Sequence, residues 1–464
     1  MSLHSSSEAS SIGSGPFPFK SITIPLTLFV VILGVYWASP VVTVTDSIWN
    51  LYTAASILRE GNFDIDEYAQ HIDLEDDIRV MSSKGHIYSV YPVATPIISA
   101  PFLWLANEYF SLRNSQDFFA YLKKNHPNDV TGKLEKAIAS VIAAAAAVPM
   151  YLIGRVSQLD QKRSIILALL FALASSMWST ASRAMWQHGP SVLFLTISLL
   201  IMVAARKKES LISYAGFFIA IAYIIRPNNS LSVILTSLYV LINHRRFFLY
   251  YILSAAVVAI PFLFNNWVTH GVLLPAYYFQ LFNKLTSTPA GFFEAFAGTM
   301  ISPSRGLFIF TPLYIFSVYG MYLEFRKGNF QIQQPHPYLL AIIIGHWLVV
   351  SSFADWDGSV SIGPRYFVDI TPYLFFFLIP VLHDFGTALH STFWRYAFVT
   401  TALISILIQF RCSTSIYPFL WNRYPVTYPD GATYRDWDWS DMQILRGFCP
   451  EDPERGQAPA CWFD

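Results

Sequence analysis

The stretch ITIPLTLFVVILGVYWASPVVTVTDS, residues 22–47, decides the fold class of this chain. Residues 22–42 contain no charged side chain. A helix rises about 1.5 Å per residue, so about 20 apolar residues cross the hydrocarbon layer of a membrane. The run is longer than the apolar part of a signal peptide and lacks a small-residue cleavage site, which predicts a helix that is retained in the membrane.

The composition of the whole chain extends this prediction. Of its 464 residues, 54% are hydrophobic and only 13% are charged, whereas a soluble domain has about 45–50% and about 25%. A larger core does not explain the difference, because the surface of a soluble protein still has to be wetted. The formal net charge is zero, which argues against nucleic acid as a partner, since a basic stripe would then be expected. The sequence therefore predicts an all-α polytopic membrane protein.

Apolar runs of spanning length recur along the chain and predict about eleven transmembrane helices. Two of the runs meet at the sequence RPNN, residues 226–229. This predicts a helix–turn–helix whose polar tip must reach water or a protein cavity. No internal repeat is evident, so the sequence gives no support for an inverted-repeat transporter. The predicted spans are 21–43, 134–153, 163–181, 187–205, 211–225, 229–243, 247–264, 306–323, 337–353, 367–382 and 396–410.

The charges of the connecting segments predict the topology. Lys and Arg gather in alternate short connections, and the positive-inside rule makes that side cytoplasmic. With eleven spans, the leader at residues 1–19, which we expect to be disordered, is cytoplasmic and the tail at residues 411–464 is extracytoplasmic. A large first extracytoplasmic loop, residues 44–133, lies between the first two spans of the transmembrane domain, residues 20–410. We expect a multi-pass protein of a bacterial inner or plasma membrane.

The first loop contains two apolar segments that we do not count as spans. Residues 91–110 are apolar enough to cross, but a crossing would place every later basic loop outside. Their prolines at 92, 96 and 101 also break a straight helix, so a re-entrant or interfacial segment is expected. Residues 47–60 place apolar side chains on one helical face, which is typical of a helix in the membrane interface.

All three cysteines lie near the end of the chain, at Cys412, Cys449 and Cys461. None has the spacing of a zinc or iron–sulfur site. In an extracytoplasmic tail, Cys449 and Cys461 can form a disulfide, and free thiols are the equal alternative.

Asp46 is the first candidate for chemistry. It follows the first span at the predicted outer interface, where a carboxylate is mildly costly and easily avoided, so a functional role is the default hypothesis. The alternative is an N-cap, because Asp46 directly precedes the amphipathic helix and Asp is favoured at that position. The sequence leaves both interpretations open.

The exit of the first loop is the second candidate. The acidic run at residues 64–77 is typical of solvated surface, but the continuation SSKGHIYSVYP, residues 82–92, alternates like a short strand. This pattern predicts Lys84 and His86 on one face, close to Tyr88.

Three more polar motifs occur at predicted outer helix ends. They are SRAMWQHGP (182–190), SPSRGLF (302–308) and ADWDGSVSIGPRYF (354–367). His188, beside Arg and Trp and ahead of a helix, suits an anion site. Arg305 and Arg365 lie beside Gly and Pro in turns that open onto spans. Snorkelling anchors and belt aromatics are the simpler interpretation. However, all the polar motifs lie on one side of the membrane, so we expect the function to face outward.

Together these features resemble the C-type glycosyltransferase superfamily (GT-C), and more narrowly its bacterial branch of lipid A aminoarabinose transferases and protein O-mannosyltransferases. The motifs that carry the resemblance are Thr45-Asp46-Ser47, YPVATP (91–96), SPSRGL (302–307) and GPRY (363–366), and the likeness covers roughly residues 20–410. Two positions depart from the pattern. Ser47 stands where many relatives have Glu, and His188 stands where many have a second Asp.

The resemblance implies an inverting transfer of a sugar from a polyprenyl-phosphate donor, reached from the membrane lipid, to a hydroxyl of a glycan, lipid or protein acceptor. Asp46 would be the general base. No metal motif appears, so no cofactor is required, although a divalent metal is not excluded. A transporter or lipid flippase without glycosyl transfer is the alternative. The residues implied in donor phosphate binding are Arg365, Arg305, Lys84 and His188, and those implied in sugar or acceptor binding are His86, Tyr88, Trp186, Trp356 and Tyr366.

Overall fold

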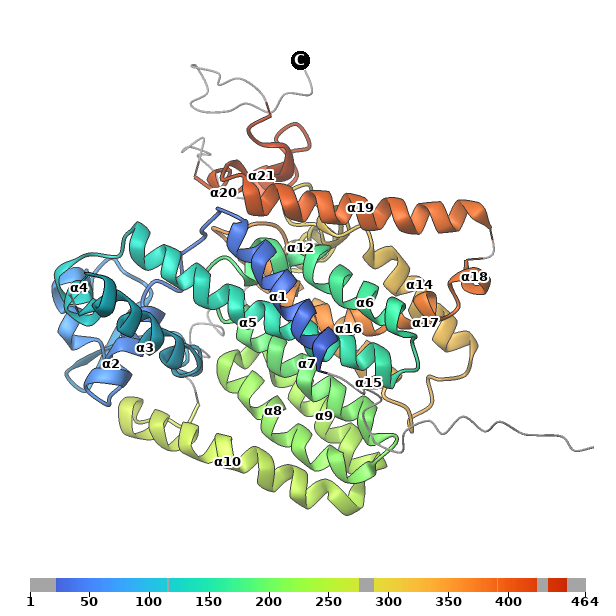
Figure 1. The fold of residues 1–464 in the computed structure, drawn as a ribbon, viewed down its shortest axis with the longest axis horizontal. Helices are drawn as coiled ribbons and strands as arrows, with labels where there is room; N and C mark the ends of the chain where they lie inside the picture. The colour runs from blue at the N-terminus through green and yellow to red at the C-terminus, as the bar shows by residue number, and fades with distance from the viewer. Residues whose placement is uncertain (1–21, 115–116, 275–287, 390, 424–432, 449–464) are drawn as a thin grey trace, which may run out of the picture.

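The computed structural model describes residues 22–114, 117–274, 288–389, 391–423 and 433–448. The described residues form a bundle of helices with a smaller lobe at one end (Figure 1). The helices of the bundle are α1 (Thr23–Ala38), α5 (Asp129–Val156), α6 (Gln161–Leu173), α7 (His188–Ala205), α8 (Ile212–Ile225), α9 (Ser230–Asn243), α10 (Arg245–His270), α14 (Tyr314–Arg326), α15 (His336–Ser351), α16 (Thr371–Phe376), α17 (Ile379–His383) and α19 (Thr392–Thr414).

Short elements connect these helices or precede them. Residues 177–181 form a π-helical turn after α6, and the other connections are 3₁₀ turns or short α-helices. They are η2 (Met177–Ala181), η3 (Glu209–Leu211), η4 (Pro227–Asn229), α12 (Pro289–Ile301), α13 (Leu307–Phe310), η5 (Arg365–Ile370), α18 (Phe385–Ala388), α20 (Tyr417–Leu420), α21 (Thr433–Asp436) and η6 (Gln443–Leu445).

Each of the eleven predicted spans coincides with a helix or with a run of consecutive helices. Five segments of the described chain are long and apolar enough to cross a membrane by themselves: α5, α7, α10, the segment Arg365–His383 and α19. The fold class predicted from composition is therefore confirmed: the chain is an all-helical, multi-pass membrane protein.

The segment Arg365–His383 and helix α10 occupy opposite environments. The apolar part of Arg365–His383 is 89% buried, whereas that of α10 is only 11% buried. Val257, Ile260 and Phe264 of α10 each expose more than half of their surface. A contiguous apolar face of this kind is unsuited to water. Helix α10 therefore faces lipid, and Arg365–His383 forms the centre of the bundle.

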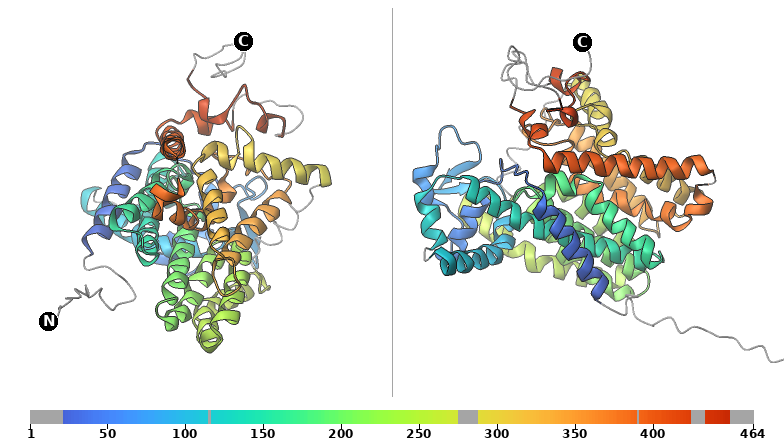
Figure 2. Two further views of the ribbon diagram at one scale, coloured as in Figure 1. Left: turned by 90° about the vertical axis from the view of Figure 1, so that its right-hand side faces the viewer. Right: turned by 45° about the horizontal axis from the view of Figure 1, so that its top comes forward.

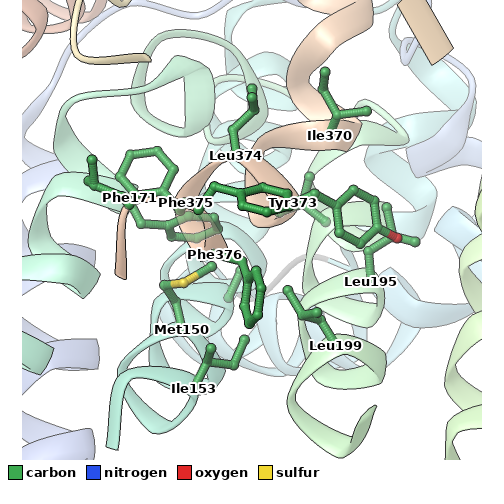
Figure 3. Close-up of a cluster of buried hydrophobic side chains, with 14 of the residues drawn as sticks. Met150, Ile153, Phe171, Leu195, Leu199, Ile370, Tyr373, Leu374, Phe375 and Phe376 are labelled. Atoms are coloured by element: carbon green, nitrogen blue, oxygen red, sulfur yellow. The ribbon is translucent and has the colours of Figure 1, made fainter. Parts of the chain in front are cut away.

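Aromatic and aliphatic side chains fill the core around this central segment. Phe375 packs edge-to-face against Phe171 of α6, with ring centroids 5.5 Å apart. Figure 3 shows Phe376 beside Met150 of α5 and Leu199 of α7. Tight packing of this kind fixes the position of η5, which directly precedes α16 and carries Arg365.

The lobe at one end of the bundle is built from the first loop (Figures 1 and 2). It has a separate apolar core that includes Trp49, Tyr52, Leu103 and Phe118. Its elements are α2 (Asn50–Arg59), η1 (Asp66–His71), β1 (Val80–Ser83), β2 (His86–Ser89), α3 (Ala94–Asn114) and α4 (Phe118–Lys124).

Two expectations for this lobe concern α2 and α3. Residues 50–56 of α2 are all buried beneath other protein elements, so protein covers this helix, and its interfacial position stays a prediction. Helix α3 is continuous although Pro101 lies inside it. Pro92 precedes the helix and Pro96 lies in its first turn, where no amide hydrogen bond is lost. Helix α3 packs on α2 and exposes Trp104 and Leu112, so the interfacial interpretation fits α3.

The predicted strand is half of a hairpin. Strands β1 and β2 pair antiparallel, with Ser83 opposite His86. Lys84 and Gly85 form the two-residue turn, and both have positive φ angles, 50° and 88°, as this tight turn requires. Lys84 is therefore a turn residue and does not share a strand face with His86, contrary to the prediction. Among the cysteines, Cys412 is buried and free, while Cys449, Cys461 and the leader lie outside the described residues.

Candidate functional site

Asp46 and Arg365 form an ion pair at the lobe end of the bundle. Arg365 Nη1 donates to Asp46 Oδ2 over 2.8 Å. The arginine side chain is only 9% exposed, whereas the aspartate is 38% exposed. A guanidinium buried to this extent requires a counter-charge, and Asp46 supplies it while one face of the carboxylate remains open to solvent.

Two aromatic rings from the predicted motifs flank this arginine. The Arg365 guanidinium lies 4.7 Å from the ring centre of Trp186 and 5.4 Å from that of Tyr366. The Trp186 Nε1 in turn donates to the carbonyl of Thr43 over 2.9 Å. Cation–π contacts in a desolvated site are worth about 2 kcal/mol. The rings therefore hold the guanidinium flat beside the segment that carries Asp46.

Asp46 does not cap the following helix. The N-cap of α2 is Trp49, and no side chain caps this end. A second arginine approaches Asp46 instead, because Arg79 Nη1 donates to the carbonyl of Thr45 over 3.3 Å. Arg79 also forms a two-point ion pair with Asp77, at 2.6 and 2.9 Å. The N-cap interpretation is therefore wrong.

A second carboxylate, which the sequence motifs did not single out, lies near Asp46. Glu135 of α5 is 1% exposed, and its Oε2 accepts a hydrogen bond from Ser47 Oγ over 2.6 Å. The same oxygen is 3.4 Å from the backbone nitrogen of Met185. Glu135 therefore ties the residue after Asp46 to the start of α5. An ionisable residue inside a predicted span was the available signal.

His188 belongs to a buried network one layer further into the bundle. Arg226 Nε lies 2.9 Å from Asp369 Oδ2, and His188 Nδ1 lies 3.4 Å from the same oxygen. Because Arg226 Nη1 donates to His188 Nε2 over 3.2 Å, Nδ1 carries the imidazole proton and faces Asp369. Ser191 Oγ donates to the other Asp369 oxygen over 2.8 Å.

This network shows where the α8–α9 turn lies, and it contains a charged residue of a predicted span. The polar tip of the α8–α9 turn reaches a protein interior, since Arg226 is 5% exposed. Asp369 is the one charged residue of the predicted span 367–382, which was a signal for a functional position. His188 is thereby engaged by protein groups beneath Arg365.

Lys84 and Arg305 are also engaged elsewhere. Lys84 Nζ donates to the carbonyls of Trp267 and Val268, at 3.3 and 2.5 Å, and so caps the last turn of α10. Among the described residues, neither cation contacts Asp46. Arg305 is 2% exposed, and its guanidinium donates to the carbonyls of Ser304, Ser359 and Ser361 and to the side chains of Asn422 and Gln443.

A carboxylate of the tail completes the surroundings of Arg305. Asp436 Oδ1 accepts from Ser304 Oγ over 2.6 Å and lies 3.9 Å from Arg305 Nε. Burial raises the pKa of Asp436 to about 6, and Arg305 opposes the rise. Arg305 therefore fastens the tail onto the bundle.

The remaining predicted residues lie around the hairpin and α12. His86 Nδ1 pairs with Asp66 Oδ2 at 2.6 Å, and the ring of Tyr88 packs edge-to-face on His270. Trp356 is buried against Gly298 of α12, where any side chain larger than hydrogen would collide with the indole. The structure thus gathers Asp46, Arg365, Trp186 and Tyr366, and it places the other candidates in separate surroundings.

Asp64, Asp66 and His86 could together hold a metal ion. One potential ligand atom of each lies within 4.8 Å of the others. Burial is the largest effect on Asp64 and raises the pKa of this carboxyl, so its charged form needs a nearby cation. Two carboxylates and one imidazole suit a divalent metal.

No family model and no curated protein matches the sequence. A similar solved structure is ArnT from Cupriavidus metallidurans, crystallised with bound undecaprenyl phosphate. It shares 13% sequence identity with this chain and has a TM-score of 0.45, over 86% of this chain and 72% of that one. A likeness at this level does not establish a shared fold.

Proposed function

We propose that the chain is a membrane glycosyltransferase that moves a sugar from a polyprenyl-phosphate donor to an acceptor hydroxyl on the lobe side of the membrane, taken as extracytoplasmic. The observation that carries the proposal is the ion pair between Asp46 and Arg365. The reaction requires a base for the acceptor and a fixed cation for the leaving phosphate. These two residues supply both groups within 2.8 Å of each other.

The chemical step uses the open side of the carboxylate. Asp46 takes the proton of the acceptor hydroxyl on Oδ1, the oxygen that Arg365 does not contact. The acceptor oxygen then bonds to the anomeric carbon, and the bond from that carbon to the lipid phosphate breaks. The electron pair leaves with the phosphate. One displacement inverts the anomeric centre.

Arg365 retains donors for that phosphate. Its buried Nε has no hydrogen-bond partner among the described residues, so protein groups do not saturate the guanidinium. An arginine can present two parallel N–H groups to a phosphate, so the guanidinium can hold the leaving group while Nη1 still orients Asp46. Trp186 and Tyr366, whose rings flank the guanidinium, exclude water from it. Charge stabilisation is stronger in such a dry site.

A groove beside Asp46 provides access for a lipid donor. A cavity of about 840 Å³ lies between residues 40–48, the start of α5 and the end of α19. Val44 and Ile48, on either side of Asp46 in the sequence, line it together with Val41, Val42 and Phe419. This apolar part of the lining suits the hydrocarbon chain of a polyprenyl phosphate, and Asp129, Lys133 and Arg423 belong to the polar part of the lining.

The test is transfer by the purified, detergent-solubilised protein from a panel of polyprenyl-phosphate sugars. Asp46→Asn should reduce transfer about 10²–10⁴-fold while donor binding is retained. Asp73→Asn, an exposed carboxylate of the same loop, is the matched control and should keep full activity. Equal transfer by Asp46→Asn and the wild type would remove Asp46 from the mechanism.

Transport of a lipid or solute is the second candidate, and one observation favours it. The buried ion pair of Asp369 and Arg226 lies inside the bundle, and intramembrane charges mark transport pathways in many proteins. Proteoliposomes that hold a fluorescent polyprenyl phosphate distinguish the two functions. The wild-type protein would translocate the lipid and show no sugar transfer if it is a transporter, whereas the glycosyltransferase would transfer sugar without net translocation.

A further inference from the structure

The end of the bundle away from the lobe has a second cavity. Figure 1 shows α17 and α18 at this end, opposite α2, α3 and α4. A cavity of about 460 Å³ opens there between the ends of α5, α7, α14 and α17 and the start of α15. This volume is in the range of small-molecule sites. Its lining includes Val156, Val203, Phe376, Ile379, Arg206, Lys207, Glu324, Lys327, His336 and Asp384.

The carboxylates of this cavity have positively charged partners, whereas two of its cations have no ion pair among the described residues. Lys327 lies 3.5 Å from Glu324 and 3.3 Å from Asp384, so it serves both carboxylates. Glu324 also accepts a hydrogen bond from Asn329 over 2.5 Å. His383 and Lys327 hold the pKa of Asp384 below its usual range. The two carboxylates are therefore charged and partnered.

Two cations at the rim are left over. Arg206 and Lys207 follow directly after α7 and are exposed, and no ion pair to either is found among the described residues. His336, at the start of α15, is 5% exposed. Its Nε2 lies 3.4 Å from Glu324, but its Nδ1 has no partner in the described part of the chain. The cavity thus offers two free positive charges and one unused buried polar atom.

The apolar part of the lining indicates the kind of anion. Val203, Phe376 and Ile379 are buried and form an apolar wall of the same cavity. A free inorganic ion gains nothing from such a wall, whereas an amphiphile places its glycerol and first methylenes against it. The positive-inside rule assigns this basic end to the cytoplasmic leaflet, whose lipids include anionic species.

We propose that this cavity binds the phosphate headgroup of an anionic phospholipid of the cytoplasmic leaflet. Arg206 and Lys207 contact the phosphate, and the wall of Val203, Phe376 and Ile379 contacts the start of the acyl chains. The site is separate from the Asp46–Arg365 pair and does not depend on the proposed glycosyl transfer. A lipid bound there links α7 to α16 and α17 and holds this end of the bundle together.

The test is a titration of the full-length protein in neutral detergent with phosphatidylglycerol, phosphatidylcholine or inorganic phosphate, followed by thermal unfolding and native mass spectrometry. Phosphatidylglycerol should raise the unfolding temperature saturably and remain bound in the gas phase. The double variant Arg206→Gln/Lys207→Gln should weaken this binding at least about tenfold. Lys208→Gln, an exposed lysine of the same connection that does not line the cavity, should leave it unchanged.

Three results would overturn the proposal. Equal loss of binding in Lys208→Gln would mean attraction to a basic surface without a site. An equal effect of inorganic phosphate at the same residues would replace the lipid by a free anion. Equal binding of phosphatidylcholine would remove the role of charge. A further variant, Ile379→Asn, tests the apolar wall. It should weaken phosphatidylglycerol but leave any response to inorganic phosphate unchanged.

Discussion

Arg365 Nη1 lies 2.8 Å from Asp46 Oδ2, although 319 residues separate the two in the sequence. The pair joins the segment after α1 to the start of the most buried segment of the bundle. In the proposed mechanism, the donor phosphate would share the Arg365 guanidinium with Asp46 while Nη1 keeps its contact with the carboxylate. Sharing the positive charge in this way would make the carboxylate a better proton acceptor.

Arg365→Lys tests whether the site needs only a positive charge or also the planar shape of the guanidinium. Lysine keeps the positive charge but loses the planar fork and the stacking between Trp186 and Tyr366. We expect kcat/KM for transfer to fall about 10²-fold, with weaker donor binding and little change in thermal stability. Arg79→Lys, on the other side of Asp46, serves as the control. Equal losses in both variants would mean that Arg365 has no special role.

Asp369→Asn should destabilise the protein strongly. The substitution leaves Arg226 buried without its counter-ion, and breaking a buried pair costs about 3–5 kcal/mol. The double variant Asp369→Leu/Arg226→Met removes both charges and should regain most of the loss. Unfolding by sodium dodecyl sulfate, followed by circular dichroism, measures both. A double variant as unstable as the single one would show that the pair does not act as a unit.

Arg305→Ala should loosen the tail without affecting donor binding. The substitution removes five hydrogen bonds and leaves Asp436 without its neighbouring cation. We expect faster proteolysis in residues 433–448 and an unchanged Kd for polyprenyl phosphate. Arg246→Ala, an exposed arginine of α10 that does not line the proposed donor groove, should change neither. A weakened Kd in Arg305→Ala alone would return Arg305 to the phosphate site.

In its pair with Asp66, His86 should have a higher pKa than an unperturbed histidine. The hydrogen bond to Asp66 raises the pKa of His86 above its ordinary value of about 6.5. The stability contributed by the pair is therefore complete below about pH 6.5 and is lost as the pH rises through the raised pKa. In Asp66→Asn, the pKa of His86 should fall, as measured by NMR of ring protons. An unchanged pKa would show that the pair does not form in solution.

The sequence predicted the class and the helices because hydropathy is a property of contiguous residues. A run of about 20 apolar residues has few alternatives to a spanning helix, and all eleven predicted runs are helical. Local patterns did not reveal that protein covers residues 50–56 of α2, because the sequence of one helix does not show what packs on it.

The partners of the polar side chains were decided only by the tertiary structure. Asp46, Arg365, Trp186 and Tyr366 were each identified from the sequence, and the packing of η5 beside the segment after α1 brings them together. Lys84 and Arg305 carry the same positive charge as Arg365, but nearby backbone carbonyls engage them. A polar side chain forms a hydrogen bond with a complementary donor or acceptor that the fold places within about 3 Å of it. That distance depends on how segments hundreds of residues apart pack, which no local pattern specifies.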